Sequence, residues 1–295
     1  MSELINLETF VATARAGSFA AAARQLGVTP ALVGRRIEAL EERHGARLIE
    51  RTTRAQRLTE LGEGFLVRAE AVLDAAAELD ELTRADAGQL SGRIRVSGPT
   101  TLGIVRLAPI VADFCAAHPG VTVELQLNDR RIDLVNDGFD LAVRVGVLQP
   151  SGLIARRIGT YGFAVCAAPA FLERHGTPRT PAELSSARCI LNLNIVPRNQ
   201  WVFHGPGGDA VVAEVGGGLQ IDNGEAQRTA ALAGAGIAYL PLDLVRADLA
   251  AGRLTAILTH WQTLTLPIHL VHPSRRLVPR RLTAVMDAIA HGMRA

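Results

Sequence analysis

The amino-acid sequence predicts an α/β protein in which a small, mostly helical N-terminal domain is joined by one long helix to a larger α/β region. Apolar residues recur at helical spacing between Leu4 and Leu40, and again between Phe65 and Leu79. After Ser91-Gly92 the pattern changes to short β-branched runs that alternate with helical ones, as in α/β domains. We therefore expect three successive parts, at residues 1–58, 59–90 and 91–295.

Helix start and stop signals divide the first part into three short helices. Ser18 and Thr29 are favoured N-cap residues, and Pro30 falls in a first turn, where its missing N–H is not needed. Glycine favours helix ends, and the three helices are followed by Gly17, Gly27 and Gly45. The second and third helices, joined by Gly27 and Val28, have the outline of a helix-turn-helix.

An arginine-rich hairpin and a long helix follow. Residues 46–58 are β-prone and contain four arginines, which predicts a wing beside the helix-turn-helix. From Thr59 a helix is expected to run to about Arg84, with an apolar seam that indicates packing against a second helix. The seam consists of Phe65, Ala69, Val72, Ala76 and Leu79.

Positive charge is concentrated in the N-terminal part. Between Arg24 and Arg57 there are eight arginines and four glutamates, although the whole chain has a formal net charge of only +2. Such an excess favours contacts with phosphates, while a basic helix by itself can also be merely solvated. The hairpin and the long helix that follow favour DNA binding.

The third helix is expected to carry the base contacts. Its buried stripe is predicted at Val33, Ile37 and Leu40, which turns other residues of its first half outward. These outward residues are Ala31, Leu32, Gly34 and Arg35. The guanidinium of Arg35 has the donor geometry that binds guanine.

Several classes of protein are not indicated. Three cysteines, far apart and odd in number, give neither a disulfide framework nor a zinc pattern, so we expect reduced core thiols at Cys115, Cys166 and Cys189. The N-terminus lacks the pattern of a signal peptide, and the longest run free of both charged residues and histidine, residues 158–172, is too short to span a membrane. A cytoplasmic protein with no membrane partner is expected.

Enzyme motifs are also missing. The sequence has no G-x-S-x-G and no Walker sequence, and Gly234-Ala235-Gly236 matches only half of the dinucleotide fingerprint. His269 and His272 lie on a predicted strand, where residues three apart point to opposite faces, so they are not expected to share a metal. We expect no catalytic residues, no metal and no cofactor.

The larger region should form a sheet of short strands flanked by helices. Strands are predicted near Arg93–Ser97, Val121–Leu127, Leu141–Val145, Phe163–Ala168, Ile190–Leu193, Ile237–Leu240 and Ile268–His272. The triplet Gly216-Gly217-Gly218 predicts a bend or hinge.

Two segments of this region, residues 97–101 and 222–224, each join a predicted strand to a predicted helix. Ligands of α/β sheets bind beyond the carboxyl ends of strands, often at helix N-termini, whose N–H groups favour anions. A small carboxylate or similar anion is therefore expected, although Ser, Thr and Asn also cap helices without binding a ligand. Arg144 is either a clamp for the ligand or a partner of Asp140.

Two sets of segments carry a resemblance to a known family. The first set is Ala16–Ala23, Leu26–Thr29, Ile37–Glu41, Gly45, Leu48, Arg51–Arg54, Leu58-Thr59 and Gly62. The second set is Pro119–Val121, Asp133-Leu134, Gly138–Gly146 and Ala233–Ile237. Together they resemble the LysR-type transcriptional regulators over nearly the whole chain. Two residues of the third helix depart from the family pattern. Pro30 stands where the family often has a polar residue, and Gly34 stands where it usually has serine.

The resemblance implies a winged helix-turn-helix, a linker helix at residues 59–90, and a two-lobed, periplasmic-binding-protein-like (type 2) sensor domain. Lobe one is expected at about residues 91–161 plus 269–295, and lobe two at about 162–268. It also implies dimers or tetramers formed partly through the linker helix, an interrupted palindromic operator in double-stranded DNA, RNA polymerase as a partner, and a nucleoid-associated location.

The candidate site residues follow from the pattern and the resemblance together. The DNA-binding residues are Ser18, Thr29, Pro30, Ala31, Leu32, Gly34, Arg35, Arg36, Arg51, Thr52 and Arg54. The effector-binding residues are Ser97, Thr100, Thr101, Arg144, Val147, Asn194, Asp222 and Asn223. The alternatives are a small-molecule binding protein without a DNA role and an α/β enzyme with an appended DNA-binding arm, neither of which explains the wing.

Overall fold

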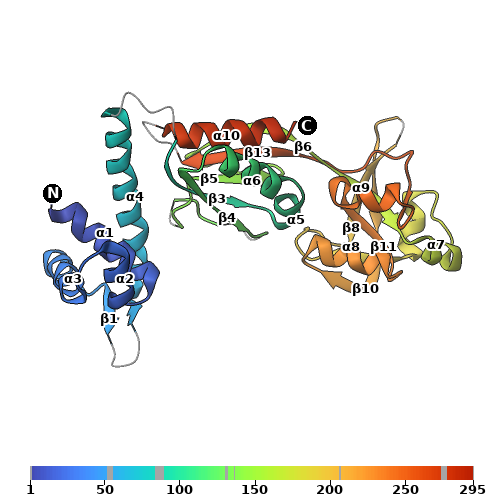
Figure 1. Cartoon of the computed structure of the whole chain (residues 1–295). Helices are drawn as coiled ribbons and strands as arrows, with labels where there is room; N and C mark the ends of the chain where they lie inside the picture. The colour runs from blue at the N-terminus through green and yellow to red at the C-terminus, as the bar shows by residue number, and fades with distance from the viewer. Residues whose placement is uncertain are drawn as a thin grey trace.

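The computed structural model describes residues 2–51, 56–83, 90–129, 132–135, 137–205, 207–273 and 278–294. The N-terminal domain places three helices and a two-stranded hairpin beside a fourth, long helix (Figure 1). These elements are α1 (Ser2–Ala16), α2 (Phe19–Leu26), α3 (Pro30–His44), β1 (Ile49–Arg51), β2 (Gln56–Leu58) and α4 (Glu60–Thr83). The predicted helix-turn-helix, wing and long helix are therefore confirmed.

The predicted caps hold the helix-turn-helix in shape. The hydroxyl of Ser18 accepts a hydrogen bond from the Ala21 N–H at 3.2 Å, and that of Thr29 accepts from the Leu32 N–H at 3.3 Å. Gly27 ends α2 in the left-handed region, at φ 64°. The chain can therefore turn sharply between α2 and α3 without the strain that a side chain would add.

The core of the N-terminal domain lies between α1, α3 and α4. Phe10 and Ile37 are fully buried, and the Phe65 ring of α4 meets the Phe10 ring edge-on, with centroids 5.3 Å apart. Ala69, one turn further along α4, is also buried in this core. Packing of this apolar stripe joins α4 to the helix-turn-helix.

The hairpin is fixed to the helices by polar contacts of its backbone. The Glu41 carboxylate accepts hydrogen bonds from the N–H groups of Leu48 and Ile49 at 2.8 and 3.0 Å. Thr59 caps α4, because its hydroxyl accepts a hydrogen bond from the Gly62 N–H at 2.9 Å. The start of the hairpin and the start of α4 are thus held to the same end of α3.

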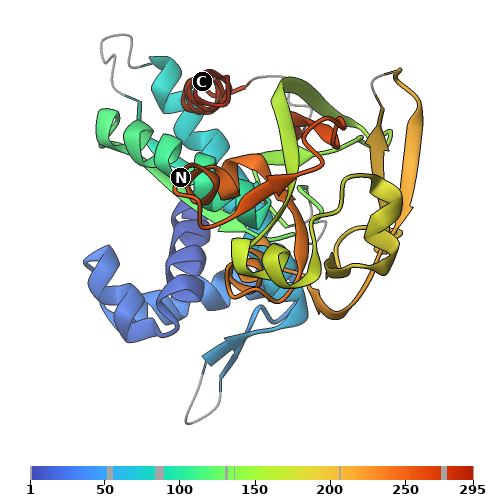
Figure 2. The same cartoon turned by 90° about the vertical axis from the view of Figure 1, so that its right-hand side faces the viewer.

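Among the described residues, nine strands form one sheet that continues through two lobes (Figures 1 and 2). Lobe one contains β3 (Gly92–Gly98), β4 (Val121–Leu127), β5 (Leu141–Val145) and β13 (Thr265–Pro273). Lobe two contains β7 (Arg188–Asn192), β10 (Gly216–Ile221), β11 (Ile237–Pro241) and β12 (Thr255–Ile257), with the separate hairpin β8 (Gln200–His204) and β9 (Ala210–Glu214). The long strand β6 (Leu153–Ala167) belongs to both lobes.

Strand β6 changes partners on its way between the lobes. It pairs with β13 from Leu153 to Gly162 and with β11 from Phe163 to Cys166. The order of the main path is β10-β7-β11-β6-β13-β5-β3-β4. The lobes are therefore joined by continuous strand backbone.

Helices cover both lobes. Lobe one carries α5 (Thr100–Leu102), a π-helical turn (Gly103–Leu107), α6 (Ala108–Ala117) and α10 (Arg280–Gly292). Lobe two carries α7 (Pro169–His175), a 3-10 turn (Pro181–Ser186), α8 (Gly224–Leu232) and α9 (Leu242–Ala250). Each lobe has its own apolar core, around Val96 and Val285 in lobe one, and around Phe203 and Leu240 on the two faces of the lobe-two sheet.

In the described part of the chain, one helical stretch is long and apolar enough to cross a membrane, at Thr100–Ala117 with a mean hydropathy of 1.5. Its buried side chains include Leu102, Leu107, Val111 and Phe114, which belong to the core of lobe one. We interpret it as a core helix.

Two expectations about the sheet need correction. Strand β6 begins at Leu153, well before the predicted start at Phe163. The triplet Gly216-Gly217-Gly218, predicted as a bend or hinge between elements, is part of strand β10, whose register shifts between Gly216 and Leu219. Gly217 is required there because an added Cβ would lie 1.9 Å from the Cys189 carbonyl oxygen of β7.

Gly62 is predicted to be essential for the N-terminal domain. In Gly62→Ala the added Cβ would lie 2.1 Å from the Leu48 carbonyl oxygen, a backbone atom of the hairpin that cannot move alone. The free energy of unfolding should fall by roughly 1–3 kcal/mol. Urea unfolding followed by far-UV circular dichroism measures this loss.

Gly64→Ala is the matched control, since the added Cβ would meet only the flexible end of Arg68, at 3.9 Å. The two tryptophans, Trp201 and Trp261, lie in lobe two, so the transition seen by their fluorescence should not move. A Gly62→Ala protein as stable as Gly64→Ala would contradict the conclusion that α4 and the hairpin need glycine where they meet.

Candidate functional site

The first candidate site is the exposed side of α3 and its N-terminus. Thr29, Pro30, Ala31 and Arg35 are exposed, whereas Val33, Ile37 and Leu40 are buried as the sequence predicts. Leu32 and Gly34 are half-buried. The exposed surface at the N-terminal half of α3 is therefore narrower than expected. Its exposed cation is Arg35.

Three of the predicted DNA-binding residues also have structural contacts. Ser18 caps α2, and Thr29 caps α3. Arg36 is half-buried and donates a hydrogen bond to the buried Thr9 hydroxyl of α1 at 3.2 Å. Sequence reasoning missed the Arg36 contact, because its partner lies 27 positions away in another helix.

Further arginines of the N-terminal domain are exposed. Arg24 of α2, Arg47 before β1 and Arg57 of β2 are exposed. Arg51 lies in β1, and Thr52, Arg54 and the side chain of Arg51 are outside the described residues. The N-terminal domain therefore exposes further cations besides Arg35, as contacts with a phosphate backbone require.

The second candidate site lies where the lobes meet. Thr100 starts α5 in lobe one, and its backbone N–H donates to the Asp129 carboxylate at 2.9 Å. Thr101 lies against Gly224 at the start of α8 in lobe two, where an added Cβ would be 2.4 Å from the Thr101 hydroxyl oxygen. The structure thus brings together the two segments that sequence analysis selected.

The lobe-two residues form a compact group at the ends of β7 and β10. The Asn194 side-chain amide donates to the Asp222 carbonyl oxygen, and Asn223 caps α8 by accepting from the Ala226 N–H at 3.0 Å. Asn194 and Asp222 are exposed. Both side chains are therefore accessible to solvent at this end of lobe two.

The other three predicted effector residues lie in different surroundings. Ser97 of β3 is buried, and Val147 is 80% exposed in the loop after β5. Arg144 of β5 donates to the Ile132 carbonyl oxygen at 3.3 Å, while Asp140 accepts from the Arg95 N–H at 2.9 Å. Each member of the expected Arg144–Asp140 pair therefore has another partner.

Contacts between the lobes that the sequence did not reveal come from the π-helical turn. Val105 packs against the core of lobe two, and the Arg106 guanidinium lies 3.6 Å from the Asp243 carboxylate at the start of α9. Nearby, burial raises the pKa of the Tyr161 hydroxyl, and the Asp243 carboxylate raises it further. No local signal could predict contacts between segments so far apart in the chain.

Helix α8 is held in place by a buried carboxylate. Asp248 of α9 is fully buried and binds Arg228 of α8 and Arg253. The hydrogen bond from Arg228 holds the pKa of Asp248 below its ordinary value, so the carboxylate is ionised at neutral pH. This triad fixes the helix that carries Asn223.

Metal and thiol chemistry find no support among the described residues, where no group of His, Cys, Asp and Glu side chains could hold a metal ion. Burial raises the pKa of the Cys166 and Cys189 thiols to about 12. Cys166 faces the core around Leu240, and Cys189 faces the core around Phe203, on the other side of the sheet. Cys166 and Cys189 are therefore free thiols in the core, as predicted, whereas the third cysteine, Cys115, is only half-buried at the edge of the lobe-one core.

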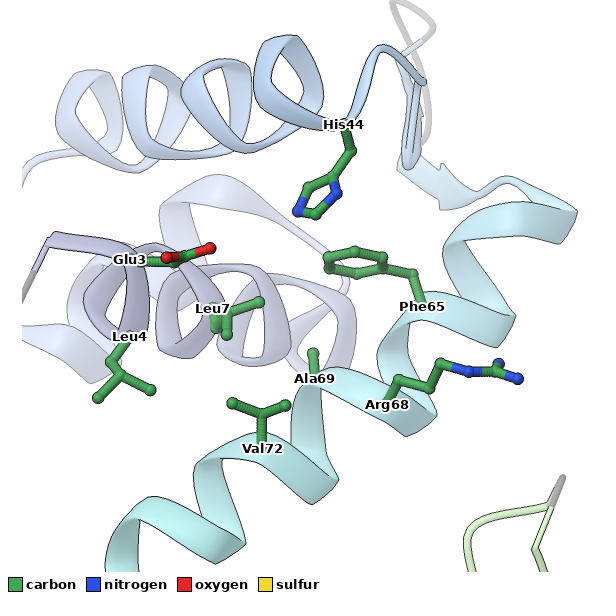
Figure 3. A pocket seen from close by; sticks show the side chains of 8 residues that line it. All are labelled: Glu3, Leu4, Leu7, His44, Phe65, Arg68, Ala69 and Val72. Atoms are coloured by element: carbon green, nitrogen blue, oxygen red, sulfur yellow. The ribbon is translucent and has the colours of Figure 1, made fainter.

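A third feature is an open groove of about 380 Å³ between α1 and α4. Figure 3 shows side chains of both helices pointing toward one another across it, with His44 of α3 beside the Phe65 ring. Leu4 is 39% exposed and Val72 is 48% exposed. An apolar strip along α1 and α4 is therefore left open to solvent in the single chain.

Comparison with known proteins identifies the family. The family model described as bacterial regulatory helix-turn-helix protein, lysR family, matches residues 4–63, and the LysR substrate binding domain matches residues 87–294. The chain belongs to the LysR family of transcriptional regulators. It combines the helix-turn-helix DNA-binding domain and the effector-binding domain of that family.

Relatives of known sequence or structure match this chain over nearly their full length. The chain is 35% identical to YhjC of Escherichia coli K12, described as an uncharacterized HTH-type transcriptional regulator, over 100% of this chain and 99% of that one. It is 32% identical to an HTH-type transcriptional repressor of Pseudomonas aeruginosa, over 97% of this chain and 91% of that one. The structure of CrgA, a LysR-type transcriptional regulator of Neisseria meningitidis, shares 31% identity, with a TM-score of 0.63 over 98% of both chains.

Gly34 departs from the family pattern, and the structure predicts how a side chain at this position changes the stability of the N-terminal domain. An added Cβ would make ordinary contact with the Phe19 ring of α2, at 3.6 Å. Gly34→Ala should therefore stabilise the N-terminal domain by about 1 kcal/mol, because alanine is the better helix former. The midpoint of urea unfolding by circular dichroism should rise, and a lower midpoint would show that α2 and α3 need a bare surface there.

Proposed function

We propose that this LysR-family protein acts as a dimer or tetramer that places two copies of α3 in successive major grooves of an interrupted palindrome. The observation that carries the proposal is the exposed N-terminus of α3, with Thr29, Pro30, Ala31 and Arg35, in a domain that also exposes arginines of α2 and the hairpin. Arg35 binds bases. Arg51 and Arg54 of the wing bind phosphates, as Arg47 and Arg57 do beside them.

The dimer forms along the open groove between α1 and α4, and its occupant is the α4 helix of a second copy. The groove combines exposed apolar side chains, Leu4 and Val72, with an apolar floor of Leu7, Phe65 and Ala69. A helix with an apolar seam is the complement that such a groove requires, and α4 offers one at Val72 and Ala76, which lie beyond the Phe65 and Ala69 packed in its own core. Pairing of α4 with its copy fixes the separation of the two recognition helices.

A small-molecule effector binds between the lobes, at Thr100, Thr101, Asn194, Asp222 and Asn223. Ser97, Arg144 and Val147 are proposed as further contacts. The Thr100 N–H, which donates to the Asp129 carboxylate, is a donor that an anionic group of the effector takes over on binding. Binding changes the contact between the lobes and through it the spacing or bending of the bound DNA.

Three parts are proposed for the chain: the DNA-binding domain at residues 1–58, the linker helix at 59–90 and the effector-binding domain at 91–295. The change of β6 partners at Gly162–Phe163 supports a division between lobe one (91–161 and 269–295) and lobe two (162–268). The protein works without enzymatic chemistry, in the cytoplasm and on the nucleoid, and contacts RNA polymerase at its promoters.

The test is binding of the purified full-length protein to the DNA immediately upstream of its own gene, with excess unrelated competitor DNA and a salt titration. A complex that survives the competitor and weakens steeply with salt is expected of a sequence-specific regulator. Equal affinity for both DNAs at every salt concentration would contradict the proposal.

Two arginine variants separate the base contacts from the phosphate contacts. Arg35→Ala should bring the affinities for operator and unrelated DNA closer together, by roughly 1–3 kcal/mol. Arg54→Ala should weaken binding to both DNAs and lower the salt slope by about one unit. Fluorescence anisotropy at a series of salt concentrations measures both quantities.

Arg179→Ala is the control, since this exposed arginine of lobe two lies outside the DNA-binding domain. It loses the same charge and should bind DNA like the wild type. An Arg54→Ala protein with the wild-type salt slope would remove the wing from the phosphate-binding surface.

A further inference from the structure

One carboxylate joins the three parts of this protein. Oε1 of Glu70, in the middle of α4, accepts hydrogen bonds from Nε and Nη2 of Arg15 in α1, at 3.1 and 2.8 Å. The same oxygen lies 3.3 Å from Nη1 of Arg93 in β3. The Glu70 side chain is only 15% exposed, so this ion pair is screened less by water than a surface pair.

The lobe-one side of this contact is a network of further charged groups. Arg93 also pairs with Glu124 of β4, and Glu124 lies 3.7 Å from Nε of Arg95. The Arg95 guanidinium donates to the carbonyl oxygens of Asp137 and Gly138 and lies over the Phe139 ring, 4.7 Å from its centroid. Arg93 is therefore oriented by lobe one, independently of α4.

Close packing accompanies the ion pair. Val67 lies one turn before Glu70 in α4 and approaches Gly138, where an added Cβ would be 2.8 Å from its Cγ1 atom. Gly138 has φ +69°, so a side chain there would be both strained and in collision. One face of α4 thus rests on the edge of lobe one, and no larger residue fits between them.

Strand β3 connects this contact to the effector site. Arg93 and Arg95 lie on the same strand as the predicted effector residue Ser97, and β3 pairs with β4 along its whole length. The strand leads directly to Thr100 of α5. A displacement at the effector end of β3 therefore reaches Arg93 through continuous hydrogen-bonded strand.

We propose that Glu70 is a positioning residue for DNA recognition, which couples the helix-turn-helix to lobe one through Arg15 and Arg93. Without the negative charge of Glu70, Arg15 loses its ion-pair partner in α4 and Arg93 retains only its lobe-one partner Glu124, so the two domains separate around α4. The orientation of α3 relative to the sensor domain then becomes variable. This inference rests on the proposed function, because it assumes that the placement of α3 determines which operators are bound.

The experiment uses the full-length protein and two variants, Glu70→Gln and Arg93→Gln, which lie in different domains. Hydrogen–deuterium exchange is measured at the amides of residues 138–140, which are hydrogen-bonded in the turn beside α4. Loss of the ion pair should speed their exchange about tenfold in both variants. Glu63→Gln is the matched control on the same helix, since Glu63 is exposed and its carboxylate has no ion pair among the described residues.

A second readout tests positioning rather than folding. Affinity is measured for a half-site, for the operator upstream of the protein's own gene, and for that operator with half a helical turn, about 5 base pairs, inserted between the half-sites. Wild type and Glu63→Gln should lose affinity strongly on insertion. Glu70→Gln and Arg93→Gln should lose at least about threefold less, with unchanged affinity for the half-site.

Wild-type exchange rates and a wild-type spacing penalty in Glu70→Gln would overturn the proposal. If Glu70→Gln does not fold, Arg93→Gln decides, because Arg93 lies outside the DNA-binding domain. If the wild type binds no DNA, the proposed function fails, while the exchange measurement still tests whether Glu70 joins the domains. The two failures are therefore distinct.

Discussion

Packing of α4 against several partners constrains the arrangement of the whole molecule. One face, with Phe65 and Ala69, completes the core of the helix-turn-helix. A second face, with Val67 and Glu70, rests on lobe one. Val72 borders the open groove beside α1, where we place a second copy. Because a helix is stiff over this length, the two domains and the dimer partner cannot be positioned independently of one another.

In the sensor domain, too, segments that contact both lobes fix the position of one lobe relative to the other. Strand β6 passes from lobe one to lobe two, and the π-helical turn of lobe one sends Val105 and Arg106 into lobe two. π-helical turns are common at functional sites. In the function proposed above, an effector between the lobes acts on segments that already contact one another, and it can shift their balance through differences in binding alone.

Much of the N-terminal domain could be predicted from the sequence, because its signals are local. The caps at Ser18 and Thr29, the buried stripe of α3 and the glycines at helix ends each depend on a few neighbouring residues. Contacts such as Arg36 with Thr9, Arg106 with Asp243 and Thr101 with Gly224 join distant segments and leave no local pattern. The strand formed by Gly216–Gly218 was missed for another reason, since glycine favours turns unless a neighbouring backbone requires close approach.

In the function that we propose, a symmetric dimer presents two α3 helices to DNA from a fixed α4 frame. Hydroxyl-radical footprinting of the wild-type protein on the DNA upstream of its own gene tests this most directly, because it maps contacts at single-nucleotide resolution. We expect two patches of DNA backbone to be protected from cleavage and to be related by two-fold symmetry. Their centres should lie a whole number of helical turns apart, about 10 base pairs per turn. A single patch without symmetry, at every protein concentration that gives binding, would contradict it.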